Sequence, residues 1–354
     1  MSAHAHAGVW DDVVGQHALI ERLERAAAHP AEAYLFVGPR GSTKWAAARA
    51  FAALVLGGSD GPTSRDVALA RRGEHPDITE VVRSGPAISA PQAREIVRTA
   101  SLAPNEGARK VMLLDDFHLV RPDGAALLLK TIEEPPDSTT FVICADFVPH
   151  DLVTISSRCA RIDFVTIDDA TVAARLVEEG ADAESAAEAA AAAHGDLDRA
   201  RVLAADPALA RRRRAFAEVP RRLDGTGATV MQVVDELMAM VDDAAEPLKA
   251  RHLEEIAAVD ERAARFGERG SGRKALDERH RRELRRHRTD ELLAGLTAVA
   301  ATYRDALVGG EVVRPDSIAD GVRHIHDAIE VFERNPNEPL LLQSLLWQLP
   351  VLDG

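Results

Sequence analysis

The chain has 354 residues, enough for two or three domains with sizeable cores. It is 46% hydrophobic and 28% charged, as in ordinary globular proteins, and its net charge of −14 argues against a protein that coats nucleic acid. Two cysteines exclude a disulfide framework and a cysteine-rich metal site built from this chain alone.

Targeting and membrane signals are not visible in the sequence. The first twelve residues lack a basic start followed by an apolar core, and no run approaches 18 strongly apolar residues. We therefore expect a soluble, cytoplasmic protein.

The first 165 residues alternate short apolar runs with helical patterns. The predicted strands are 34–37, 78–82, 110–115, 139–145 and 161–164, and the predicted helices are 44–56, 91–100 and 124–134. The run 110–115 shows almost no alternation, which is typical of a strand buried on both faces. Strands that alternate with helices predict an α/β fold, with a parallel sheet and helices on both of its faces.

Strand signals end after Phe164. Residues 168–203 are predicted to form small helices around a turn at Gly195, and everything from Pro207 onward is predicted to be helical. Asn337 is a candidate cap for the last helix, 340–349. A charged loop that contains Gly and Ser, residues 267–272, is the expected soft spot.

Residues 38–45, GPRGSTKW, follow a predicted strand and open a predicted helix. A phosphate-binding loop belongs at such a place, because backbone amides and a helix N-terminus favour phosphate. Thr43 replaces the glycine expected before the lysine, and Trp45 replaces the Ser or Thr whose hydroxyl would coordinate Mg²⁺. The loop is either a degenerate nucleotide site or a simple connection. Its candidate nucleotide-binding residues are Gly38, Gly41 and Lys44.

Asp115 and Asp116 end a buried apolar strand, the usual position of an acidic pair beside bound Mg²⁺. In motor ATPases a glutamate in the second position orients the attacking water, and Asp116 is one methylene shorter. The alternative is a pair of carboxylates that caps the following turn. With Trp45 in place of a metal ligand, we expect a nucleotide site that is inactive in hydrolysis.

Four short motifs resemble those of bacterial clamp-loader subunits. Residues 128–136, LLKTIEEPP, closely resemble the signature LLKTLEEPP, and residues 157–159 resemble the SRC motif at the expected distance. Residues 14–16 (VGQ) and 75–77 (HPD) are similar to two further segments of the family. The chain is thus similar to the AAA+ clamp-loader family of DNA polymerase III. Its damaged phosphate loop resembles the stationary delta-prime type of member more than the motor subunits.

The resemblance implies three domains: an AAA+ core at residues 1–165, a small helical lid at 166–206 and an all-α collar at 207–354 that assembles the complex. It implies motor (gamma/tau) and delta subunits, a sliding clamp and primed DNA as partners, with ATP bound by the partner subunits. Many relatives carry a four-cysteine zinc module after the first helix. Residues 57–77 contain no cysteine, so we expect no zinc and no other cofactor in this chain.

The resemblance makes Arg158 the candidate catalytic residue. A guanidinium is permanently charged and forked, so it can cross a subunit boundary and stabilise the transferring γ-phosphoryl group. Such arginine fingers are worth about 10³ to 10⁵ in rate. The alternative is an arginine that caps a helix and pairs with a local carboxylate.

Possible roles for three other residues follow from the resemblance and from their chemistry. Arg199 lies near the position where such modules place a nucleotide-sensing arginine; with a damaged pocket, the alternative is a residue that only forms a salt bridge. Cys159 is expected to be a small packing residue rather than a nucleophile. Lys130 lies on a helix that the resemblance places toward primed DNA.

These observations predict a non-hydrolysing, delta-prime-like subunit of a DNA polymerase holoenzyme, which scaffolds the clamp loader and donates Arg158 to a neighbouring ATPase site. Two alternatives stay open. One is a motor subunit that hydrolyses ATP itself, and the other is a free-standing DNA-binding protein that uses the arginine clusters 211–214 and 281–288. Neither cluster has interleaved aromatic residues, and nearby carboxylates favour ion pairs on the helix surface.

Overall fold

The computed structural model describes residues 8–57, 61–83, 87–266, 273–309, 314–332 and 336–352. The chain divides into two compact units, Met1–Ala200 and Arg201–Gly354. The loop expected at residues 267–272 lies outside the described residues. The division into three domains stays a prediction.

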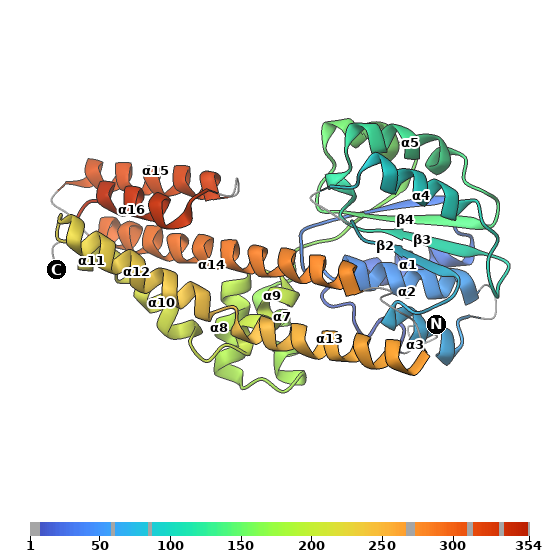
Figure 1. Cartoon of the computed structure of the whole chain (residues 1–354), viewed down its shortest axis with the longest axis horizontal. Helices are drawn as coiled ribbons and strands as arrows, with labels where there is room; N and C mark the ends of the chain where they lie inside the picture. The colour runs from blue at the N-terminus through green and yellow to red at the C-terminus, as the bar shows by residue number, and fades with distance from the viewer. Residues whose placement is uncertain are drawn as a thin grey trace. The chain divides into compact units, whose positions relative to one another are not determined.

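The first unit is built on a five-stranded parallel sheet with the strand order β2-β3-β4-β1-β5 (Figure 1). The strands are β1 (Ala33–Val37), β2 (Ile78–Val81), β3 (Lys110–Leu114), β4 (Thr139–Ala145) and β5 (Ala160–Asp163). Every residue of β1, β3 and β4 is buried, which explains why β3 shows no alternation in the sequence.

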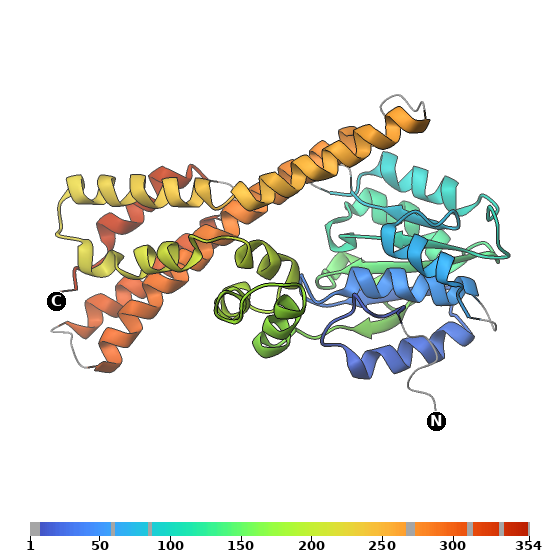
Figure 2. The ribbon, with the colours of Figure 1, turned by 90° about the horizontal axis from the view of Figure 1, so that it is seen from below.

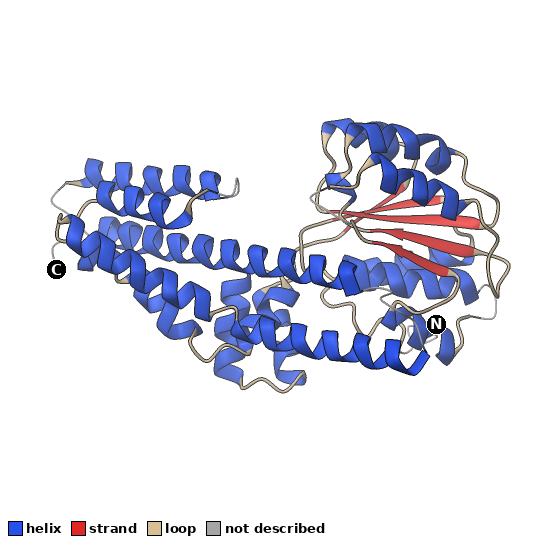
Figure 3. Cartoon of the chain, viewed as in Figure 1, coloured by secondary structure: helices blue, strands red, loops and turns tan. Residues whose placement is uncertain are grey.

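Helices cover both faces of this sheet (Figure 3). They are α1 (His17–Ala28), α2 (Lys44–Gly57), α3 (Ser64–Arg72), α4 (Ala90–Ala100), α5 (Pro122–Glu133) and α6 (Val153–Ser156), with short 3₁₀ turns η2 (Phe117–Leu119) and η3 (His150–Leu152). Alternate strand positions face opposite cores: Phe36 packs in the core with α1 and α2, and Leu35 in the core with α4 and α5. The predicted α/β fold class is confirmed.

Three helices of the first unit were not predicted from the sequence, namely α1, α3 and the four-residue α6. The N-terminus of α3 carries a clear signal, because Thr63 and Asp66 form a capping box in which each side chain accepts from the other residue's backbone N–H. The α1 helix lacks a side-chain cap, so only its apolar spacing marked it.

Three small helices follow the sheet, as predicted: α7 (Asp169–Glu178), α8 (Ala183–Ala193) and α9 (Leu197–Ala204). Asp168 and Asp182 cap α7 and α8 through their carboxylates. Gly195, between α8 and α9, has a φ of +83°, and a Cβ there would lie 2.3 Å from Thr166. Glycine is therefore required where the chain turns into α9.

The second unit is all helical in the described residues, and this prediction is confirmed. Its helices are α10 (Leu209–Ala217), α11 (Val219–Arg222), α12 (Gly227–Asp243), α13 (Glu246–Phe266), α14 (Arg273–Gly309), α15 (Pro315–Phe332) and α16 (Glu338–Gln348). Its core contains Phe216 and Tyr303, and Asn337 caps α16 as expected. In the described parts of the chain, no helix combines the length and apolarity needed to cross a bilayer.

Candidate functional site

The carboxyl ends of three adjacent strands bring the candidate nucleotide-site residues together. The loop 38–43 follows β1, Asp115 follows β3, and Asp146 follows β4, which lies between the other two. Ligands of open α/β sheets bind outside this edge. The strand order therefore places Lys44, at the start of α2, near both carboxylates.

The Lys44 ammonium group is neutralised within the chain. Its Nζ donates to Asp146 Oδ1 at 2.6 Å and to the Pro39 carbonyl at 3.2 Å. The Lys44 side chain is only 10% exposed and that of Asp146 22%. Asp146 therefore forms an ion pair with the lysine that a phosphate-binding loop would direct toward a phosphate. The sequence interpretation missed Asp146, although an acidic residue directly after a seven-residue buried strand was a signal for it.

Asp115 and Asp116 form a closed turn at the end of β3. Burial, and then the nearby Asp116 charge, raises the pKa of Asp115 to about 6. Asp115 Oδ1 accepts from the Asp116 N–H at 2.8 Å, and Asp116 forms an ion pair with Arg83 at 2.7 Å. The backbone of Asp116 is left-handed, with φ +49°. These contacts give the two carboxylates a role in the turn itself.

His118 completes the acidic group. Its Nδ1 accepts from the Asp146 N–H at 3.2 Å, and its Nε2 lies 3.7 Å from Asp146 Oδ2. Burial lowers the pKa of His118, although Asp146 and Asp116 act in the opposite direction. A neutral imidazole protonated on Nε2 fits both contacts.

Thr43 holds the loop in a conformation that normally favours glycine. Its φ is +60°, which costs a β-branched residue about 1–3 kcal/mol. Its hydroxyl accepts from the Val14 N–H at 3.2 Å and donates to the Val14 carbonyl at 3.3 Å. Two hydrogen bonds to the Val14 backbone thus offset the strain and hold the loop in place.

A carboxylate lies directly against the other side of the loop. Gly41 has φ +67°, and a Cβ there would lie 2.3 Å from the Asp196 Cα. Asp196 also contacts Arg40 at 3.4 Å and accepts from the Arg199 N–H at the start of α9. Gln16 donates to the Ser42 carbonyl at 3.3 Å. The loop is therefore packed on several sides by groups of the chain itself.

Trp45 is a packing residue. It contacts the core that contains α1 and α2, and the Arg49 guanidinium lies 5.7 Å from the centre of its ring. Arg49 in turn forms a bidentate pair with Glu80 at 2.6 and 2.7 Å. No hydroxyl stands at this position to coordinate Mg²⁺.

Arg158 lies on the surface after α6 and is 36% exposed. Its Nε lies 2.8 Å from Glu133 Oε1 on α5, and its Nη1 donates to the Thr154 carbonyl at 2.8 Å. In the single chain it therefore caps α6 and pairs with a carboxylate, as the alternative interpretation expected. The contacts join the 128–136 and 157–159 motifs in space.

The remaining candidate residues differ in how far they are exposed and in what they contact. Lys130 is exposed on α5, and Arg199 lies half-buried in the first turn of α9. Cys159 is partly buried, and burial raises its pKa to about 11. Asp77 of the HPD motif accepts from the N–H groups of Glu106 and Gly107; although burial opposes ionisation, backbone hydrogen bonds lower its pKa. That motif fixes the loop before β3.

The two arginine clusters take part in ion pairs. Arg212 is 3% exposed and pairs with Asp206 and Glu291, each at 2.6 Å. Arg288 pairs with Asp242 and Glu338. These contacts favour the ion-pair interpretation over a nucleic-acid site. Within the described residues, no three His, Cys, Asp or Glu side chains form a group that could hold a metal ion. The expectation of no zinc stays a prediction.

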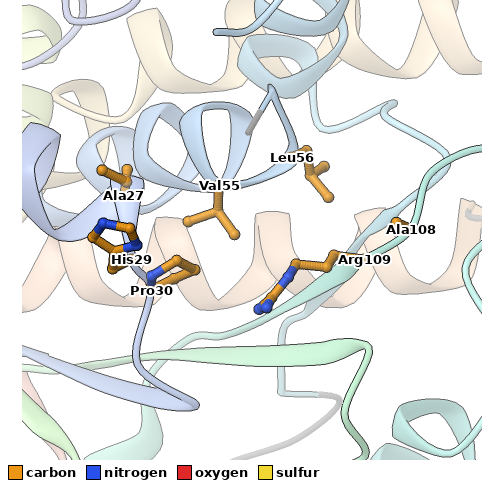
Figure 4. Close-up of a pocket in the computed structure, with 8 residues that line it drawn as sticks. Ala27, His29, Pro30, Val55, Leu56, Ala108 and Arg109 are labelled. Carbon is orange, nitrogen blue, oxygen red and sulfur yellow. The ribbon is translucent and has the colours of Figure 1, made fainter. Parts of the chain in front are cut away.

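A cavity of about 500 Å³ lies at the far end of α2 (Figure 4). Its lining comes from the ends of α1 and α2 and the loop before β3, namely Ala27, Ala28, His29, Pro30, Val55, Leu56, Ala108 and Arg109. Because α2 rises about 1.5 Å per residue, the cavity lies roughly 15 Å from Lys44. It is separate from the candidate nucleotide site.

Comparison with known proteins places the first unit in a family. Residues 15–168 match the family model described as DNA polymerase III, delta subunit. The chain is 33% identical over 175 residues to the DNA polymerase III subunit tau of Bacillus subtilis, covering 47% of this chain and 31% of that protein. It is 34% identical over 154 residues to the subunit delta' of Pseudomonas aeruginosa, covering 41% and 46%.

Over residues 15–168, these matches support a member of the clamp-loader family of bacterial DNA polymerase III. The motif-based prediction of an AAA+ clamp-loader family member is thus confirmed. A solved structure of a gamma subunit-related protein from Thermotoga maritima is similar with a TM-score of 0.46 and 16% identity, covering 93% of this chain and 97% of that one. The clamp-loader chain spans less than half the length of the curated relatives named here.

Proposed function

We propose that this clamp-loader family member is a non-hydrolysing, delta-prime-like subunit that donates Arg158 to the ATP site of a neighbouring motor subunit. It scaffolds a cytoplasmic complex with gamma/tau and delta subunits, which loads the sliding clamp on primed DNA. The chain itself contributes no ATP turnover, and its own loop serves as a fixed part of the scaffold.

The observation that carries this proposal is the internal ion pair between Lys44 and Asp146. A bound nucleotide needs that lysine for its phosphates and a hydroxyl after it for Mg²⁺. Here the lysine is already paired, Trp45 stands in the hydroxyl position, and the Asp196 carboxylate lies against Gly41. The residues present therefore do not fit Mg²⁺-bound ATP.

Arg158 supports the second half of the proposal. It is exposed, permanently charged and placed in a motif shared with clamp-loader subunits. Its contacts with Glu133 and Thr154 are surface contacts, which are worth about 0–1 kcal/mol for the ion pair, so a triphosphate can compete for the guanidinium.

A motor subunit that hydrolyses ATP is the second candidate. It is favoured by the relatives, since identity to a tau subunit, 33%, is close to identity to a delta' subunit, 34%. Binding of Mg²⁺-bound ATP to the isolated chain distinguishes the two. Tight, Mg²⁺-dependent binding would favour the motor, and weak or absent binding favours the scaffold.

The arginine-finger role is tested by Arg158→Ala in the assembled complex, with DNA-stimulated ATP hydrolysis as the measurement. Hydrolysis at the facing site should fall by about 10³-fold. Arg161→Ala is the matched control, because Arg161 is an exposed arginine three residues away that pairs with Asp163. Turnover equal to that of the unmodified complex would rule the role out.

A further inference from the structure

We infer that Glu133 is a positioning residue for Arg158: it orients the guanidinium so that its outer N–H groups face the neighbouring subunit's nucleotide. The inference rests on the proposed function and adds to it a second residue, taken from the LLKTIEEPP motif. Glu133 touches no reacting atom in this role and acts only through Arg158.

The contacts divide the guanidinium into a held side and an open side. Glu133 Oε1 binds Nε at 2.8 Å, and the Thr154 carbonyl accepts from Nη1 at 2.8 Å. Ser157 Oγ lies 3.4 Å from the same Nη1. Within the described residues no partner is found for Nη2. Two N–H groups are thus left to meet a phosphate while the other edge stays fixed.

Local stability does not explain a glutamate at this position. Glu133 lies in the last turn of α5, where the helix dipole disfavours a negative charge. The side chain is 45% exposed and that of Arg158 36%, so their ion pair adds little to folding. What the pair does supply is a single orientation for a long, rotatable side chain.

Rigid elements on both sides support this orientation. Glu133 is carried by α5, whose Leu128 and Ile132 are buried in the core. The backbone around Arg158 is tied to α6, since the Ser157 and Arg158 N–H groups donate to the Val153 and Ile155 carbonyls, each at 3.0 Å. The side chain is therefore aimed from two anchored positions, as an arginine that acts in trans requires.

The test measures kcat and KM for ATP in the assembled complex with Glu133→Ala, Glu133→Gln and Glu134→Ala. We expect Glu133→Ala to lower kcat about two- to fivefold with KM nearly unchanged. Glu133→Gln keeps the length and an acceptor oxygen but loses the charge, so it should retain more of the rate than Glu133→Ala. Glu134 is exposed and forms no described contact with Arg158, so Glu134→Ala should behave like the unmodified complex.

A double mutant separates this inference from the proposed function. If Glu133 acts through Arg158, Glu133→Ala adds no further loss to Arg158→Ala. The inference is overturned if Glu133→Ala leaves the rate unchanged or raises it, or if it lowers the rate equally with and without Arg158. In either case, an Arg158→Ala complex that is defective in ATP hydrolysis still supports the proposed function. An Arg158→Ala complex with normal turnover overturns both.

Discussion

At the scale of single residues, the charged groups around Lys44 include two carboxylates, those of Asp146 and Asp115. Asp146 pairs with the lysine, and Asp115 is buried beside an acidic neighbour. This ion pair and the buried acid predict measurable effects on stability and on its pH dependence.

Removing the Asp146 charge should destabilise the fold, because it leaves the Lys44 ammonium poorly exposed and without its carboxylate. We expect Asp146→Asn to lower the free energy of unfolding by about 1–3 kcal/mol, measured by urea denaturation. Lys44→Met added to it should restore part of the loss. Asp137→Asn, at an exposed carboxylate, is the control and should change little. An unchanged Asp146→Asn protein would contradict the internal ion pair.

The pKa of Asp115, raised to about 6 from an ordinary value of 3.8, predicts that stability depends on pH. Between these values the folded state holds a proton that the unfolded state has lost, so this contribution to stability is present below about pH 4 and lost as pH rises through 6. The difference in the free energy of unfolding between Asp115→Asn and the unmodified protein should shift by about 1–3 kcal/mol in favour of Asp115→Asn when the pH is raised from 4.5 to 7.5. Urea denaturation at both pH values measures it, and a constant difference would refute it.

At the scale of elements, α13 and α14 are braced by a repeated pattern, Arg-His-x-x-Glu, at residues 251–255 and 279–283. The two helices lie side by side (Figure 2). His252 and His280 stack with 3.7 Å between ring centres, and each imidazole contacts the glutamate of the other helix: Glu283 at 2.7 Å and Glu255 at 3.0 Å. The repeat thus forms a reciprocal cross-brace between antiparallel helices.

The cross-brace predicts acid sensitivity. Burial, together with His280, lowers the pKa of His252 below 6.5 in spite of its hydrogen bond to Glu283. At acidic pH the unfolded chain binds a proton at His252 more readily than the folded chain does. The contribution of the neutral His252 to stability is therefore present above about pH 6.5 and lost as pH falls. His252→Gln should lose less stability than the unmodified protein from pH 7.5 to 5.5, as measured by thermal unfolding.

The matched control is His326→Gln, because His326 is exposed on α15. It should show the acid sensitivity of the unmodified protein. If His252→Gln and His326→Gln respond alike to acid, the stacked pair does not contribute.

At the scale of the whole molecule, the chain consists of two compact units with different structures. The first carries the sheet, the closed phosphate loop and Arg158, and the second is helical in its described residues. The proposed function places ATP turnover in a neighbouring subunit, with Arg158 as the contribution of this chain.

Thermal unfolding of the isolated chain tests the closed loop directly. Adding 1 mM Mg²⁺-bound ATP should leave the midpoint within about 1 °C, since Lys44 is already paired. A ligand present at 100 times its Kd would add about 2.7 kcal/mol and raise the midpoint of a unit this size by roughly 5–10 °C. A rise of that size would favour the motor subunit.

Much of the fold could be predicted because local patterns encode it. All five predicted strands are found with ends that differ by at most one residue. Apolar runs of this length between turns identify buried strands, and strands that alternate with helices restrict the sheet to a parallel one. Helices α1, α3 and α6 were not predicted: α1 lacks a side-chain cap and α6 has only four residues, whereas the capping box of α3 was a signal that went unused.

The sequence by itself determined the parallel sheet, the family membership and the candidate role of Arg158, because these follow from runs, spacings and short motifs. The partners of the key charges were decided only by the tertiary structure. Asp146 lies 102 residues from Lys44, and Asp196 lies 156 residues from Arg40. Helix and strand spacing rules reach only a few residues along the chain, whereas the order of strands in the sheet decides which carboxylate meets which loop.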